Sequence, residues 1–348
     1  MLHLTVRPYH LRYHRPFATA HGSRTGTDAV FLQLVRNGVK SYGEAALPPY
    51  LQERADRVRA VLEAVSPAGL DEVRAVPEAL AWIDRATAGS KGARSALVMA
   101  YYDLTANEIG CSVESMVKVE AGPSARAMAT LGMMPAEQVP EALRALPKVG
   151  VLKVKVDAAQ GEVLLKAARE HWSGAFFLDG NQGLDFVDQA LRLLDVLEGR
   201  EVLGFEQPFP VDRPELHRDL GERSGITVFA DEAVQDAGDL DAVAGAYGGV
   251  NVKGLKCGGL DRALELARAA RSRGLKVQLG CMSESSLGCA AMLPLNALAD
   301  LADLDGPWLI ANDPFSGLEV RNGAYQATGD QGFGVQLARS LFDDPFGT

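Results

Sequence analysis

Short apolar runs alternate with longer segments whose apolar residues recur at helical spacing. Between residues 127 and 304 eight such runs follow one another, each of a length typical of a buried strand. In order they are Ala127–Leu131, Val151–Val156, Phe176–Leu178, Val202–Phe205, Thr227–Ala230, Gly249–Val252, Lys276–Leu279 and Leu301–Leu304. Helical spacing is found between them, for example in Pro135–Leu146, Gly161–His171, Leu184–Leu197 and Leu260–Arg273. This order predicts parallel strands joined by helices.

The spacing of equivalent strand positions predicts a closed barrel. Apolar residues recur about every 25 residues, which suits a compact (β/α)8 barrel. The alternative is a doubly wound sheet, which needs a glycine-rich turn after its first strand. No GxGxxG sequence follows any of the eight runs. We therefore expect an α/β fold whose catalytic domain, residues 121–316, is a (β/α)8-type barrel.

The segments on either side of the barrel predict a second domain. Strand patterns occupy Leu2–Arg7, Ala29–Arg36 and Lys40–Glu44, with Asn37-Gly38 as the turn between the last two. Helical patterns follow at Val58–Ala64, Val76–Thr87 and Arg94–Ile109. We expect an α+β capping domain of residues 1–120 over the barrel mouth. The C-terminal segment 317–348 is expected to complete it, with strands and turns between Gly317 and Leu337.

Composition narrows the class of protein. The net charge of -10 argues against a protein whose main partner is nucleic acid. No apolar run approaches the roughly 18 residues of a membrane span, and the N-terminus lacks the apolar core of a signal peptide. The four cysteines show neither a CxxC motif nor a Cys/His metal spacing. We expect a cytoplasmic enzyme without a membrane or nucleic-acid partner.

Carboxylates follow three consecutive predicted strands. Asp179, Glu206 and Asp231 stand where the third, fourth and fifth strands end. The active sites of such barrels form at the C-terminal ends of the strands, so these three acids should face one ion. Hard oxygen ligands without His or Cys suit Mg²⁺, with Mn²⁺ as an alternative.

Lysines end the second and sixth predicted strands. These strands are four apart in a ring of eight, so Lys155 and Lys253 should lie on opposite sides of whatever the metal holds. One amine can then take a proton from one face of a carbon atom while the other returns a proton to the opposite face. Lys153 shares the inward face with Lys155, because side chains alternate along a strand.

Together these motifs resemble the enolase superfamily, in particular its muconate-lactonizing subgroup. The closest resemblance is to dipeptide epimerases of the L-Ala-D/L-Glu type. It rests on the cap helix at Ala96–Leu104, the Lys-x-Lys pair, the three acids and the stretch Asn251–Gly259, in which Lys253 rather than Lys256 matches the second catalytic lysine. It implies a modified barrel with one Mg²⁺ per subunit. The reaction would invert the α-carbon of a dipeptide's C-terminal residue through an enediolate. We also expect a homo-oligomer.

The resemblance further implies the residues that bind substrate. Residues matching Cys281 and Ser283 border the dipeptide, and Asp303-Leu304-Asp305 matches a DxD motif that holds the substrate ammonium. Thr130, Lys153 and Arg24 complete the predicted substrate-binding set. Supporting roles behind the ligands and lysines are expected for Asn181, Glu232 and Glu284.

Two other functions stay open at this point. N-acylamino acid racemases and o-succinylbenzoate synthases use the same lysines and metal on substrates without a free ammonium. Such substrates would leave Asp303 and Asp305 without a positive partner, which is unfavourable for desolvated carboxylates. The alternative from another class is a catalytically silent metal-binding barrel, which should have lost a lysine or a metal ligand. The dipeptide side chains, the pathway and the oligomeric state remain open.

Overall fold

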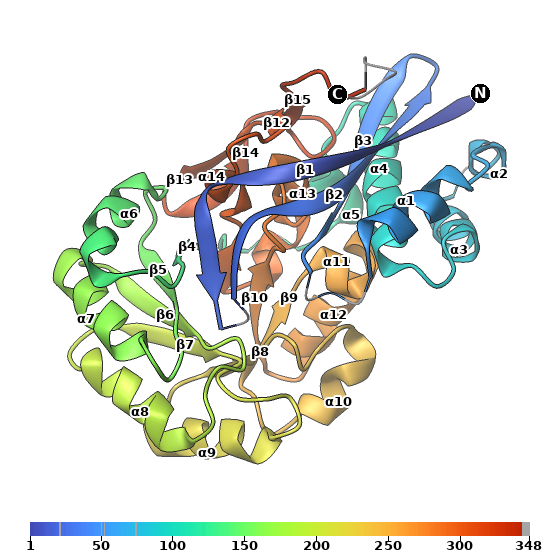
Figure 1. The fold of residues 1–348 in the computed structure, drawn as a ribbon. Helices are drawn as coiled ribbons and strands as arrows, with labels where there is room; N and C mark the ends of the chain where they lie inside the picture. The colour runs from blue at the N-terminus through green and yellow to red at the C-terminus, as the bar shows by residue number, and fades with distance from the viewer. Residues whose placement is uncertain (21, 50, 52, 74, 121, 343–348) are drawn as a thin grey trace.

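Eight parallel strands form a closed barrel at the centre of the computed structural model, which describes residues 1–20, 22–49, 51, 53–73, 75–120 and 122–342 (Figure 1). The ring order is β10-β11-β4-β5-β6-β7-β8-β9. The strands are β4 Arg126–Leu131, β5 Val151–Lys155, β6 Ala175–Asp179, β7 Val202–Glu206, β8 Val228–Ala230, β9 Gly249–Val252, β10 Lys276–Gly280 and β11 Leu301–Asp303. Each lies within one residue of its predicted ends, and the predicted (β/α)8-type barrel is confirmed.

Helices surround the barrel on its outside. The longer ones are α6 Val139–Ala145, α7 Gly161–His171, α8 Val187–Val196, α9 Pro214–Ser224 and α12 Leu260–Ser272, and the short ones are α10 Leu240–Val243, α11 Gly254–Cys257, α13 Ser286–Ala290 and α14 Gly306–Leu309. Short 3₁₀ turns lie at Ala136–Gln138, Ala237–Asp239 and Leu293–Leu298. The predicted helix at 135–146 is thus divided, because Pro140 lacks an N–H group and occupies the first turn of α6.

A three-stranded antiparallel sheet forms the base of the cap. Its strands are β1 Leu2–Thr19, β2 Gly22–Arg36 and β3 Val39–Leu47, in that order across the sheet. The predicted turn between β2 and β3 is present, with φ values of 51° at Asn37 and 83° at Gly38. Both β1 and β2 are much longer than predicted. In β1 an alternating pattern continues beyond Pro8, with Leu11 and Tyr13 buried between exposed polar residues, and the prediction missed it. Nearer the tip of the two-stranded ribbon, residues 14–16 and 22–23 are exposed and show no apolar pattern.

The helices of the cap cover one face of this sheet. They are α1 Ala55–Glu63, α2 Ala68–Asp71, α3 Val76–Ala86, α4 Lys91–Ile109 and α5 Val113–Val117. The Ser90 hydroxyl caps the start of α4, and Gly110 ends the helix in the left-handed conformation. A side chain at Gly43 would lie 2.0 Å from the Ala96 carbonyl oxygen, so α4 packs directly against β3. No helix in the described ranges is long and apolar enough to cross a membrane.

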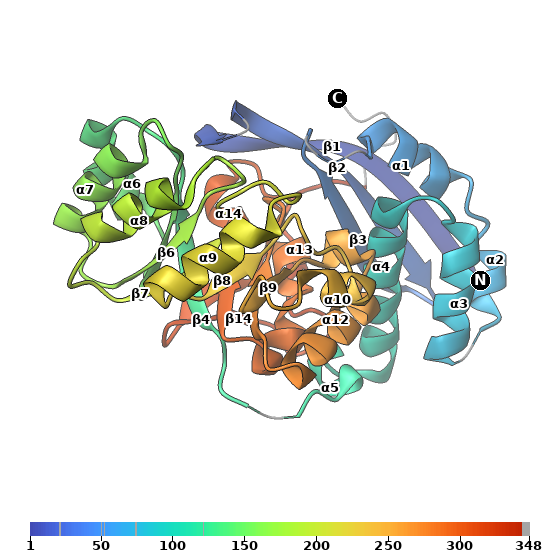
Figure 2. The ribbon, with the colours of Figure 1, turned by 90° about the horizontal axis from the view of Figure 1, so that it is seen from below.

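The β1–β2 ribbon reaches from the cap across the barrel mouth, as Figures 1 and 2 both show. At its tip the Met133 N–H donates to the Ala18 carbonyl oxygen at 3.0 Å, just beyond the end of β4. A side chain at Gly183, after β6, would lie 2.8 Å from Ala20. The cap therefore covers the ends of β4 and β6.

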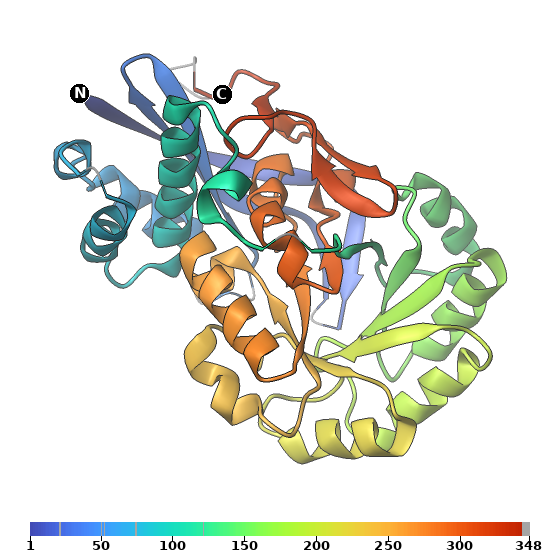
Figure 3. The same ribbon diagram turned by 180° about the vertical axis from the view of Figure 1, so that it is seen from behind.

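The C-terminal segment contacts both parts of the molecule (Figure 3). Its strands are β12 Phe315–Ser316, β13 Leu318–Arg321, β14 Ala324–Ala327 and β15 Gln336–Leu337. The Ala127 N–H donates to the Gly323 carbonyl oxygen at 2.8 Å in the barrel, and the Phe333 N–H donates to Asp103 Oδ1 at 3.1 Å in the cap. The domain boundaries near residues 120 and 317 remain a prediction, and residues 343–348 lie outside the described part.

Candidate active site

A cavity of about 720 Å³ lies between the cap and the C-terminal ends of the barrel strands. Its walls contain most of the predicted site residues, namely Arg24, Thr130, Lys153, Lys155, Asn181, Asp231, Glu232, Lys253, Cys281, Ser283, Asp303 and Asp305. Asp179, Glu206 and Glu284 are buried and are not among the lining residues. The fold thus brings the predicted residues to one site.

Lys153 lies at the centre of the buried charges. Its Nζ atom is 2.8 Å from Asp179, 2.7 Å from Glu206 and 2.7 Å from Asp303. Burial disfavours its ammonium form, but the three carboxylates outweigh this effect and hold the pKa of Lys153 well above its usual value. The three carboxylates therefore favour the positively charged form of Lys153 at the floor of the cavity.

Lys155 and Lys253 face the cavity from opposite sides of the ring. Lys155 ends β5 and lies 2.6 Å from Asp179, whereas Lys253 follows β9 and lies 2.7 Å from Asp231. The ring order places β5 and β9 four strands apart, as predicted. Lys256 Nζ also contacts Asp231 and donates to two backbone carbonyl groups, of Asp231 at 2.7 Å and Asn251 at 3.0 Å. Those backbone bonds fix its position.

The three predicted metal ligands come from the ends of β6 and β7 and from the residue after β8. The side-chain amides of Asn251 and Gln278 donate to Glu206 at 2.9 and 2.8 Å. Burial and the charges of Asp179 and Asp231 raise the pKa of Glu206 to about 7. The three acids are thus close enough to repel one another.

Mg²⁺ fits this donor set by its chemistry. All three side chains offer hard oxygen atoms, they come from adjacent strands, and a divalent cation would relieve the repulsion that acts on Glu206. Their carboxylates face lysine ammonium groups in this structure. In the described ranges no group of three or more His, Cys, Asp or Glu residues has a geometry that could hold a metal ion. The binding of one Mg²⁺ by Asp179, Glu206 and Asp231 therefore remains a prediction.

A second group of acids lies where β11 meets β4. The Thr130 hydroxyl donates to Asp303 Oδ1 at 2.9 Å, and the Thr130 N–H donates to Asp305 Oδ2 at 2.5 Å. Burial and the charge of Asp303 raise the pKa of Asp305 to about 7. A substrate cation bound here would stabilise the ionised form of Asp305.

The loop after β10 forms the neighbouring wall. Cys281 and Ser283 both line the cavity, as predicted. Ser283 has a φ of +61°, which residues other than glycine rarely adopt. Glu284 lies behind the wall and accepts the Met282 N–H at 3.0 Å, and burial raises its pKa to about 7.

Comparison with known proteins agrees with this geometry. Residues 1–117 match the model of the mandelate racemase / muconate lactonizing enzyme N-terminal domain, and residues 136–341 match that of the enolase C-terminal domain-like family. The chain belongs to the mandelate racemase/muconate lactonizing enzyme family. Membership in the enolase superfamily, predicted from the sequence, is confirmed.

Several relatives within this family are epimerases. The chain is 30% identical over 337 residues to the L-Ala-D/L-Glu epimerase of Bacteroides thetaiotaomicron. This match covers 95% of this chain and 87% of that protein. It is 30% identical over 348 residues to the hydrophobic dipeptide epimerase of Roseobacter litoralis, covering 95% and 99%. The crystal structure of the dipeptide epimerase from Methylococcus capsulatus, complexed with Mg and L-Arg-D-Lys, superimposes with a TM-score of 0.84, 27% identity and coverage of 96% and 98%. The chain is thus an isomerase, as predicted.

Arg24, Asn181 and Glu232 are the remaining predicted site residues. Arg24 lies at the tip of the β1–β2 ribbon, where it donates to the Thr27 hydroxyl at 3.1 Å and lies 5.9 Å from the centre of the Tyr13 ring. The Asn181 N–H donates to Asp179 Oδ1 at 3.0 Å, and Glu232 lines the cavity beside Asp231. The roles of these residues remain predictions.

One network beneath the site was not predicted from the sequence. Gln207 follows Glu206 and accepts the Asp231 N–H at 3.1 Å, so it connects the ends of β7 and β8. Its amide nitrogen lies 2.9 Å from the Tyr247 hydroxyl and 3.2 Å from His217 Nε2. Burial lowers the pKa of His217 to about 4. A glutamine directly after a strand was visible in the sequence, but its partners come from distant segments.

Proposed function

We propose that this protein is a dipeptide epimerase that inverts the α-carbon of the C-terminal residue by a 1,1-proton transfer between two lysines. The observation that carries the proposal is the position of Lys155 and Lys253 on opposite sides of one cavity, with buried acids between them. The names of the relatives in Bacteroides thetaiotaomicron and Roseobacter litoralis support the same reaction.

In this mechanism the two lysines act on opposite faces of the α-carbon. One takes the α-proton as a neutral amine, and the other, as an ammonium, returns a proton to the opposite face. The roles reverse for the other stereoisomer. Asp179 and Asp231, each paired with one of the lysines, hold the two amino groups on either side of the cavity.

Asp179, Glu206 and Asp231 would hold one Mg²⁺ per subunit, or Mn²⁺ in its place. The bound cation would stabilise the negative charge that the substrate carboxylate gains as the α-proton leaves. The positive charge of Lys153 lies in the same region and stabilises negative charge there. The Methylococcus capsulatus structure, which contains Mg and a dipeptide, supports this cofactor.

Asp303 and Asp305 would bind the free ammonium group of the dipeptide. They lie on β11 and directly after it, outside the part of the ring, β6 to β8, that carries the metal ligands. Asp303 nevertheless shares the Lys153 ammonium with Asp179 and Glu206, so the two ends of the substrate would be bound a short distance apart. With an N-acylated amino acid Asp303 would keep its contact with Lys153, but Asp305 would gain no cation, and this disfavours the acylamino acid racemase alternative. Both lysines and all three predicted ligands are present, which disfavours a silent barrel.

A library of dipeptides in deuterated water tests the proposal. Deuterium uptake, followed by mass spectrometry, is expected for a subset of free dipeptides in the presence of Mg²⁺. The N-acetylated form of each active dipeptide is the matched control and should exchange far more slowly. Uptake by N-acyl amino acids in place of free dipeptides would favour the racemase alternative. The homo-oligomer and the cytoplasmic location remain predictions.

A further inference from the structure

Glu44 is a fully buried acid of the cap that contacts the barrel next to the cavity. It lies on β3 with an exposed fraction of 0%. Its Oε1 atom accepts the Ser285 N–H at 2.9 Å, and its Oε2 atom accepts the Gly288 N–H at 3.0 Å and the Ser285 hydroxyl. All three donors belong to the start of α13. A single cap side chain thus binds the segment that follows the cavity wall.

The segment held by Glu44 continues directly from the wall of the cavity. Ser285 caps α13 by accepting the Leu287 N–H, and residues 281–284 form the loop between this cap and β10. Within that loop Ser283 has a φ of +61° and lines the cavity. A residue keeps such a conformation only when its surroundings impose it. Glu44 fixes the loop at Ser285, two residues further on.

The loop is also packed against the segment that carries Asp305. A side chain at Gly306 would lie 2.2 Å from the Glu284 carbonyl oxygen and 2.9 Å from its nitrogen, so the two backbones are in direct contact. A shift of the loop would therefore disturb the residue next to Asp305. The Ser286 N–H and hydroxyl donate to Asp313 Oδ2 at 2.9 and 2.7 Å, which holds the other side of α13.

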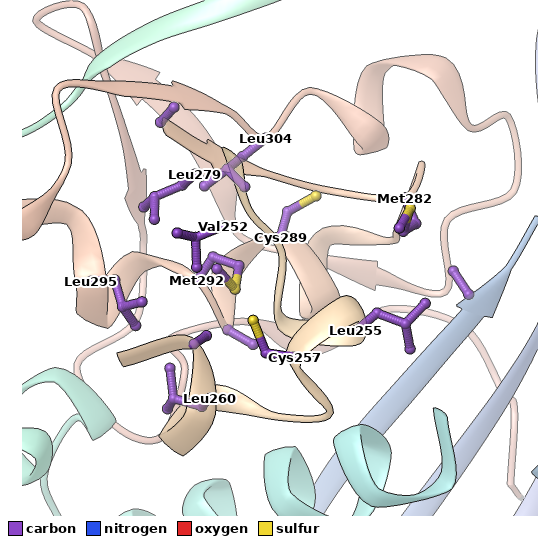
Figure 4. Packing of buried hydrophobic residues seen from close by; sticks show 14 of the residues in the cluster. Val252, Leu255, Cys257, Leu260, Leu279, Met282, Cys289, Met292, Leu295 and Leu304 are labelled. Carbon is purple, nitrogen blue, oxygen red and sulfur yellow. The ribbon is translucent and has the colours of Figure 1, made fainter. Parts of the chain in front are cut away.

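Beneath the loop the contacts are apolar. Figure 4 shows Met282 and Cys289 in the buried cluster with Leu279 and Leu304, from the strands that carry the two substrate-binding segments. Apolar contacts are not directional, so they permit small shifts of a loop that hydrogen bonds would prevent. The directional contacts at this end of the loop include those that the side chains of Glu44, Glu284 and Asp313 accept.

We propose that Glu44 is a positioning residue through which the cap sets the cavity wall at 281–285 and thereby the site for the ammonium end of the substrate. The inference rests on the proposed dipeptide reaction for its substrate. Glu44 itself does not line the cavity.

The variant Glu44→Gln tests this role. Glutamine has the same shape, but its amide group cannot accept the hydrogen bonds that both carboxylate oxygens accept here. Asp103→Asn is the matched control, because Asp103 is another buried acid of the cap that accepts two backbone N–H groups, from Tyr42 at 3.2 Å and Phe333 at 3.1 Å, away from the cavity. Both variants remove a buried cap carboxylate, but only one of them borders the loop.

Two measurements separate positioning from stability alone. For Glu44→Gln we expect the dipeptide KM to rise roughly tenfold, with a smaller fall in kcat, and amide hydrogen exchange to accelerate in residues 281–290. For Asp103→Asn we expect KM within about twofold of wild type and faster exchange near residue 333 instead.

Two outcomes of the KM and exchange measurements would overturn the proposed role of Glu44. It fails if Glu44→Gln lowers the melting temperature while KM and the exchange of residues 281–290 stay unchanged, or if both variants raise KM equally. If the wild-type enzyme epimerises no dipeptide, the proposed function fails separately. Exchange at 281–290 then decides whether Glu44 sets the loop.

Discussion

The two sides of the barrel mouth are held in place differently. On the side of β5 to β9, the lysines and the predicted metal ligands are paired with one another within the barrel, as in Lys153 with Asp179 and Glu206, and Lys153 also contacts Asp303 of β11. On the side of β10 and β11, the wall of the cavity depends on the cap, through Glu44 at Ser285. The first side carries the proposed proton transfer, and the second carries the proposed recognition of the substrate.

This difference separates chemistry from specificity. The lysines and acids of the first side are positioned by strands of one closed barrel. The second side combines segments 241 residues apart in the sequence. Under the proposed function, changes in the cap would alter substrate recognition while the proposed proton-transfer groups stay in place.

The largest effect should follow from removing divalent metal, which acts on the first side. Without the metal the three acids face lysine ammonium groups, and no divalent charge is present to stabilise the negative charge that the substrate carboxylate gains as the α-proton leaves. Chelation is expected to abolish dipeptide turnover, and added Mg²⁺ to restore it. Unfolding of the chelated protein should be measured in parallel as a control. Full turnover in a verified metal-free preparation would remove the proposed metal role.

Replacing either lysine should have the next largest effect. Lys155→Ala and Lys253→Ala should each reduce epimerisation by roughly 10²–10⁴-fold, because each removes the proton carrier for one face. Each variant should retain deuterium exchange on the face served by the surviving lysine. Lys166→Ala, on the exposed surface of α7, is the control. An epimerisation rate equal to wild type in either variant would refute that lysine's role.

A smaller effect is expected on the second side, from neutralising the two acids of β11. Asp303→Asn combined with Asp305→Asn should cost about 2–4 kcal/mol of transition-state stabilisation, or roughly 30- to 1000-fold in kcat/KM. A dipeptide analogue without the amino group should lose much less from the same double substitution. Equal losses for both substrates would show that the acids act only on the structure, for example through Lys153.

The smallest expected effect is on the free energy of unfolding of the whole protein, through the buried ring of His217 beneath the first side. His217 Nε2 accepts the Phe209 N–H, so the buried ring must be neutral, and its pKa of about 4 in the folded protein lies below the ordinary 6.5. The unfolded chain then binds a proton more readily, and the stability due to the neutral ring is lost as the pH falls from about 6.5 towards 4.

Urea unfolding of wild type and His217→Gln measures this effect. The stability difference between them should change by on the order of 1–3 kcal/mol between pH 7 and pH 5, because only the wild type gains a proton on unfolding. Comparing the two proteins cancels the titration of other buried acids. Parallel curves over this range would mean that His217 is not the group responsible.

Site residues next to apolar runs could be predicted from the sequence, and those whose partners are distant in the sequence could not. The barrel strands and Lys155, Asp179, Glu206, Asp231 and Lys253 were predictable because each acid or lysine directly follows an apolar run. The tip of the long cap ribbon was missed because residues 14–16 and 22–23 are exposed and carry no apolar pattern, whereas the alternation of Leu11 and Tyr13 with polar residues was visible in the sequence. Glu44 was missed for a related reason, since its donors are 241 and 244 residues away and no local spacing marks them.

The most direct test follows the α-protons of one active dipeptide by NMR in deuterated water. With wild-type enzyme and Mg²⁺, we expect the α-proton signal of the C-terminal residue to disappear while the second diastereomer forms. The α-proton of the N-terminal residue should persist, because only the carbon beside the carboxylate lies between Lys155 and Lys253. Exchange at the N-terminal residue, or exchange only in N-acylated amino acids, would contradict the account.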